Sequence, residues 1–93
     1  MNTFFKSKKL FRVVIRIAKA NSTFTYFILE SNENLCFYST MDASLHEPYR
    51  DIVITTAVEF KENIENLLSK LSREFQIITL ESDIIEDSAA LQV

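Results

Sequence analysis

Residues 60–75 read FKENIENLLSKLSREF, and this stretch decides the fold. Its apolar side chains recur every three or four residues, as on one face of an α-helix; they are Phe60, Ile64, Leu67, Leu68, Leu71 and Phe75. Glu59 and Glu62 stand at the start, where the helix dipole favours a carboxylate. The stretch therefore predicts an amphipathic helix whose apolar stripe, Leu68 included, lies against a sheet.

Four other stretches predict β-strands. Residues 10–18 and 50–58 alternate apolar and polar side chains with a period of two, as a half-buried strand does. Residues 35–41 and 76–81 are rich in aromatic and β-favouring residues. These stretches supply the sheet on which the helix can pack.

A second, shorter helix is expected over residues 22–31. Asn21 or Ser22 can cap its first turn with a side-chain oxygen, and apolar residues follow at helical spacing. Asn32 and Asn34 are expected to end it, because asparagine tolerates the left-handed conformation that often follows a helix.

The predicted order is β-α-β-β-α-β. Right-handed crossovers put both helices on one face of a four-stranded antiparallel sheet with strand order 4-1-3-2, which is the ferredoxin-like α+β arrangement. We expect a basic N-terminal arm over residues 1–9, the domain over residues 10–81, and an acidic tail over residues 82–93 that forms a weak helix or stays disordered.

The sheet face opposite the helices is expected to be open. Alternation puts Arg12, Val14 and Arg16 on it from the first strand, and Asp51, Val53 and Thr55 from the third. With the basic arm and an edge-strand aromatic residue, this face gives a candidate interaction surface, which comprises Lys6, Lys8, Lys9, Arg12, Val14, Arg16, Tyr38 and Val53.

Charge is unevenly distributed, although the chain as a whole carries only −3. The first twenty residues carry +6 and the remaining 73 carry −9. The basic arm can be a solvated segment, can fold onto the acidic tail, or can bind an anionic partner such as nucleic acid.

The composition excludes several classes of protein. Glycine is absent, which removes the dinucleotide-binding fingerprint and the phosphate-binding P-loop, because both need it. One cysteine and one histidine cannot form an internal disulfide or a typical structural zinc site. We therefore expect no metal and no cofactor.

No membrane association is expected either. The longest run without a charged residue, residues 20–29, has ten residues against the roughly 20 that span a bilayer. A secretory signal is not expected, because Arg12, Arg16 and Lys19 interrupt the apolar region that would follow the basic start of the chain. We expect a cytoplasmic protein of bacterial type with a reduced cysteine.

No residue is predicted to be catalytic. His46 has carboxylates near it in sequence and could act as a base or metal ligand, but a lone loop histidine is more often simply solvated. Cys36 has no basic neighbour to lower its pKa and is expected to pack as a small apolar residue.

One family resemblance adds to these expectations. Residues 27–42, FILESNENLCFYSTMD, followed by a strand and the helix of residues 60–75, resemble a family of small uncharacterised bacterial proteins, a domain of unknown function. The similarity extends over about residues 11–80. It implies an ACT-like, ferredoxin-like fold and no known catalytic residue.

Taken together, these features predict a non-enzymatic interaction or regulatory module that forms a homodimer through its open face or an edge strand. The alternative is a nucleic-acid- or ribosome-associated accessory protein that uses the basic arm. A small enzyme ranks third.

Overall fold

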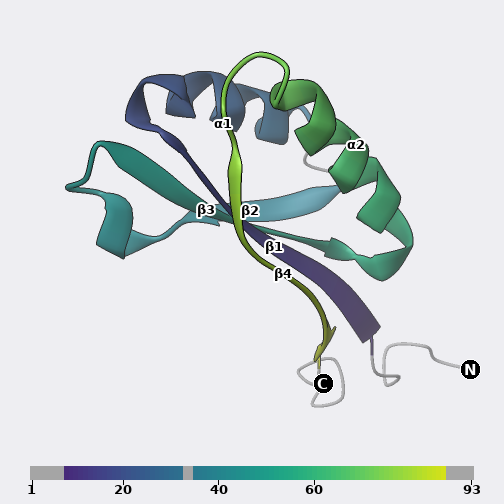
Figure 1. Ribbon diagram of the computed structural model, residues 1–93. Helices are drawn as coiled ribbons and strands as arrows, with labels where there is room; N and C mark the ends of the chain where they lie inside the picture. Colours follow the sequence, from purple (N-terminus) through teal and green to yellow (C-terminus); the bar gives the residue numbers. More distant parts are fainter. Residues whose placement is uncertain (1–7, 33–34, 88–93) are drawn as a thin grey trace, which may run out of the picture.

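The computed structural model describes residues 8–32 and 35–87 (Figure 1). The strands are β1 (Lys8–Ala18), β2 (Cys36–Thr40), β3 (Tyr49–Ala57) and β4 (Ile78–Asp87), and the helices are α1 (Ser22–Glu30) and α2 (Lys61–Leu71). Three 3-10 turns complete the described elements: η2 (Lys19–Asn21), η3 (Asp42–Ser44) and η4 (Val58–Phe60).

The strands form one antiparallel sheet in the order β2-β3-β1-β4, and both helices cover the same face of it (Figure 1). This order is 4-1-3-2 counted from the other edge, so the predicted ferredoxin-like fold is confirmed. The long strand β1 lies in the middle, between β3 and β4, while β2 and β4 are the edges of the described sheet.

The core lies between the helices and the sheet. Its buried members are Phe11, Val13, Ile15, Ile17, Leu29, Cys36, Ile52, Ile54 and Ile64. The stripe of α2 faces the sheet as predicted, because Ile64 is fully buried and Leu67 and Leu68 pack against the core. The helix is shorter than its stripe: it ends at Leu71, and Phe75 packs against the core from beyond its end.

The ends of α1 differ from the expectation. Asn21 makes no side-chain cap; the turn η2 leads into the helix, and Ser22 Oγ donates to Lys19 O at 2.7 Å. No residue of the described chain has a positive φ, so Asn32 is not left-handed; its Nδ2 instead donates to Ile28 O at 2.8 Å and satisfies a terminal carbonyl. Asn34 lies outside the described residues.

The predicted boundaries at residues 9 and 81 are crossed by strand pairing. Residues 82–87 continue β4 and form no helix, and Lys8 and Lys9 belong to β1. In the register of the sheet, Lys8 lies opposite Asp87 and Lys9 lies opposite Glu86. An oppositely charged cross-strand pair such as Lys9 and Glu86 stabilises a sheet. The acidic tail therefore extends the sheet up to Asp87, and its last six residues lie outside the described part.

Candidate functional site

Four of the predicted surface residues lie together at the centre of the open face. Arg12, Val14 and Arg16 follow one another on β1, and Val14 lies directly opposite Val53 of β3. Arg16 lies opposite Asp51. The prediction that these residues of the two central strands share one face is confirmed.

Arg16 is held by a bidentate ion pair and an aromatic ring. Its Nε and Nη2 donate to the two carboxylate oxygens of Asp51 at 2.7 and 2.9 Å, and its guanidinium carbon lies 3.9 Å from the centre of the Tyr49 ring. Side-chain exposure is 35% for Arg16 and 12% for Asp51. The hydrogen bond to Asp51 raises the pKa of Arg16, and the backbone N–H of Asp51 donates to Ser44 Oγ at 3.1 Å.

A second ion pair lies on the other side of Val14. Arg12 Nη1 donates to Glu81 Oε1 of β4 at 2.9 Å, on the solvent-exposed surface. Val14 is flanked by Arg12 and Arg16 along its strand and by Val53 and Glu81 across the sheet, and it is only 1% exposed. Long charged side chains can cover apolar neighbours with their stems, so the centre of this face is closed by the protein itself.

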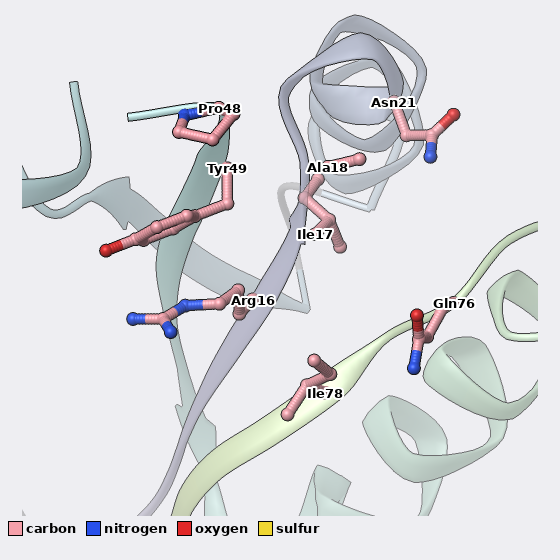
Figure 2. A pocket seen from close by; sticks show the side chains of 8 residues that line it. All are labelled: Arg16, Ile17, Ala18, Asn21, Pro48, Tyr49, Gln76 and Ile78. Carbon is pink, nitrogen blue, oxygen red and sulfur yellow. The ribbon is translucent and has the colours of Figure 1, made fainter. Parts of the chain in front are cut away.

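A hollow of about 250 Å³ opens beside Arg16, where β1 ends and β4 begins (Figure 2). Tyr49 and Pro48 line one side of it, and Gln76 and Ile78 the other. Ligand pockets usually exceed about 300 Å³ and carry several converging polar groups. Here the charged group is Arg16, already bound to Asp51, so the hollow does not have the features of a ligand site.

Tyr38, the edge-strand aromatic residue of the candidate interaction surface, lies on the helix side of the sheet and not on the open face. It lies opposite Ile54 on the helix side, stacked on Tyr26 with ring centres 5.6 Å apart. Burial raises the pKa of its hydroxyl. The exposed aromatic residue of β2 is its neighbour Phe37, which is 81% exposed and lies opposite Thr55 on the open face.

The described residues of the predicted arm lie opposite acidic residues in the register of the sheet. Lys8 and Lys9 lie opposite Asp87 and Glu86, and Arg12 lies opposite Asp83 as well as binding Glu81. Lys6 lies outside the described residues. The described part of the arm thus pairs with the acidic end of β4 in the same chain. This corresponds to the alternative in which the arm folds onto the acidic tail.

The two residues weighed for chemistry lie apart from this face. Cys36 is a buried free thiol of the core, and burial raises its pKa. His46 is exposed in the loop after η3. The described residues contain no group of three histidine, cysteine or acidic side chains that could hold a metal ion. Neither described helix has the length and apolar character to cross a membrane.

The sequence patterns did not indicate which apolar residues are exposed at the edges of the sheet. Phe37 and Met41 lie on the open side at β2, and the exposed large apolar residues of β4 are Ile78, Leu80, Ile84 and Ile85. Tyr49 was missed because β3 begins one residue earlier than expected. For β2, the alternation of side chains indicates which residues lie on the open face only once the face of one residue is known.

Comparison with known proteins adds nothing to this description: no family model, no curated protein and no solved structure matches the chain.

Proposed function

We propose that this chain is a non-enzymatic interaction module, regulatory in character, that acts as a homodimer. The observation that carries the proposal is the exposure of large apolar side chains along both edges of the sheet. Phe37 of β2 and Ile84 of β4 are the most exposed of them, at 81% and 51%. An open strand edge that carries exposed apolar residues is a template for pairing with another chain.

The chemistry of the described residues supports binding over catalysis. Cys36 is buried with a raised pKa, which suppresses the reactive thiolate. The best-organised polar group on the open face, Arg16 with Asp51, is an internal ion pair. Such a pair stabilises the sheet and leaves little capacity for an external substrate.

The nucleic-acid alternative receives less support. Binding to a phosphate backbone depends on uncompensated positive charge. Lys9 and Arg12 lie opposite Glu86 and Asp83, so their charge is compensated within the chain. We further propose that the protein works in the cytoplasm, where a lone thiol such as that of Cys36 stays reduced. The likeness to the bacterial ACT-like family also remains a proposal.

Light scattering coupled to size-exclusion chromatography tests the homodimer. We expect a mass of about twice 10.8 kDa at high micromolar concentration. A mass of 10.8 kDa throughout the micromolar range would contradict it.

A further inference from the structure

Strand β4 is poorly suited to pair with a second copy of itself. Two identical edges joined about a two-fold axis pair antiparallel, and directly opposite residues then share a face. In residues 81–87 the acids are Glu81, Asp83, Glu86 and Asp87. Every such register centred within 81–87 puts an acid of one copy directly opposite an acid of the other, and like charges at that position are destabilising.

Strand β2, the other edge, carries no charged residue: it reads CFYST from Cys36 to Thr40. It also lacks proline, so neither charge nor proline within the strand prevents pairing at this edge. No charged side chain of the strand itself opposes a second copy. The difference in charge between the two edges therefore favours β2.

The backbone groups at the β2 edge define how it can pair. Met41 N–H donates to Asp51 O at 2.8 Å, so it points toward β3. Because successive residues alternate in direction, the N–H and C=O groups of Tyr38 and Thr40 point toward the free edge. Cys36 N–H also points away from β3 but already donates to Asn32 O at 3.3 Å.

One register uses these groups fully. With Ser39 on the two-fold axis, Tyr38 of each copy lies opposite Thr40 of the other, and each pair exchanges both of its backbone hydrogen bonds. The register centred on Tyr38 is worse, because it pairs Thr40 with Cys36, whose N–H is already bonded.

The same register covers exposed apolar surface. It puts Phe37 of each copy directly opposite Met41 of the other on the open face. These side chains are 81% and 38% exposed in the single chain. Their mutual burial removes apolar surface from water at the point where the two sheets join.

From this geometry we infer that two copies pair antiparallel through β2, with Ser39 on the axis, so that two four-stranded sheets become one continuous sheet. The inference rests on the proposed homodimer and specifies its interface. Because the paired strand has only five residues, we expect a dissociation constant on the order of micromolar, weaker than that of an obligate dimer.

A disulfide cross-link tests the register. Ser39→Cys, made together with Cys36→Ala, puts two thiols on the axis, where opposite Cα atoms about 4.5 Å apart are within disulfide range. We expect mild oxidation at about 100 μM protein, well above that dissociation constant, to give mostly covalent dimer on a non-reducing gel. The matched control, Ser82→Cys in the same background, puts an exposed thiol on β4 and is expected to stay monomeric on the gel.

A charge substitution provides a second, non-covalent test. Phe37→Lys removes the exposed ring and puts a charged group directly opposite the apolar Met41 of the other copy, so we expect at least a tenfold rise in the dissociation constant. The matched control, Ile84→Lys on β4, is expected to leave it unchanged. Both side chains are exposed in the single chain, which limits effects on folding.

The outcomes separate the inference from the proposed function. If the natural chain is a dimer but the Ser82→Cys variant cross-links, or the Phe37→Lys variant remains a dimer, the β2 interface is wrong while the homodimer stands. If the natural chain is a monomer at about 100 μM by light scattering, both are wrong.

Discussion

The ion pair between Arg16 and Asp51 is expected to contribute measurably to stability, and a double-mutant cycle can measure it. The cycle uses Arg16→Met, which keeps an unbranched apolar stem, and Asp51→Asn, which keeps the shape of the carboxylate. Both hydrogen bonds of the pair are short, at 2.7 and 2.9 Å. The free energy of unfolding is obtained from urea titrations at one fixed protein concentration, since an oligomer's stability depends on concentration.

The expected coupling energy follows from partial burial. Exposed ion pairs contribute about 0 to 1 kcal/mol, and breaking a fully buried pair costs about 3 to 5 kcal/mol. With Asp51 12% and Arg16 35% exposed, we expect a coupling of about 1 to 2 kcal/mol. Arg16→Met should lower the free energy of unfolding more than Asp51→Asn, because it leaves the less exposed Asp51 carboxylate without its partner. In Asp51→Asn, by contrast, the Arg16 side chain can turn toward water.

The exposed pair on the same face is the matched control. Arg12 and Glu81 are joined by one hydrogen bond at 2.9 Å in solvent, so their coupling is expected to stay below about 1 kcal/mol and to vanish at high salt. The coupling of the Arg16 pair should persist in salt because it is less accessible to screening ions. A coupling no larger than that of the control would refute the reasoning that partial burial strengthens the Arg16 pair.

Three further outcomes are expected. Ile64→Ala removes a fully buried side chain of the α2 stripe and should lower the free energy of unfolding, measured in urea, by about 2 to 5 kcal/mol. The exposed Asn63→Ala should change it by less than about 0.5 kcal/mol. An unchanged urea midpoint for Ile64→Ala would contradict the packing. Burial raises the pKa of Cys36 in the folded state above its value in the unfolded chain. As the pH rises, the unfolded thiol therefore ionises first. The contribution of the neutral thiol to the free energy of unfolding is fully present below about pH 8.5 and is lost as the pH rises through the folded-state pKa. Cys36→Ala should lose less stability than the natural chain over that range, and identical pH profiles would count against it. Fluorescence anisotropy with short RNA and DNA should show negligible binding even at low salt, and sub-micromolar, salt-sensitive binding would revive the nucleic-acid alternative.

The sequence was sufficient where local periodicity determines structure. Alternation in residues 10–18 and 50–58 predicted that Val14 and Val53 share the open face, and the register confirms it. The apolar stripe from residue 60 predicted which side of α2 faces the sheet. In both cases a single buried face imposes the pattern, so neighbouring residues carry the whole signal.

The sequence was insufficient where the outcome depends on distant partners. Phe37 and Tyr38 are adjacent aromatic residues, and from the sequence either could have faced the helices. In the structure Tyr38 faces the helices, where it stacks on Tyr26 of α1. Residues 82–87 begin with a serine followed by acids, which locally resembles a helix start. They form a strand instead, beside the basic residues of β1, a pairing that local sequence does not encode.

The acidic end of β4 links the charge distribution of the chain to its assembly. The same acids that lie opposite the basic residues of β1 also disfavour pairing of one β4 with another in registers centred within residues 81–87. Compensation within the chain weakens the attraction of the N-terminal segment for nucleic acid, and repulsion between copies makes β4 an unfavourable edge for self-pairing. The β2 edge is uncharged, and Phe37 and Met41 beside it are exposed. One feature, the charge asymmetry seen first in the sequence, thus favours a protein partner over an anionic one and β2 over β4 as the place where it binds.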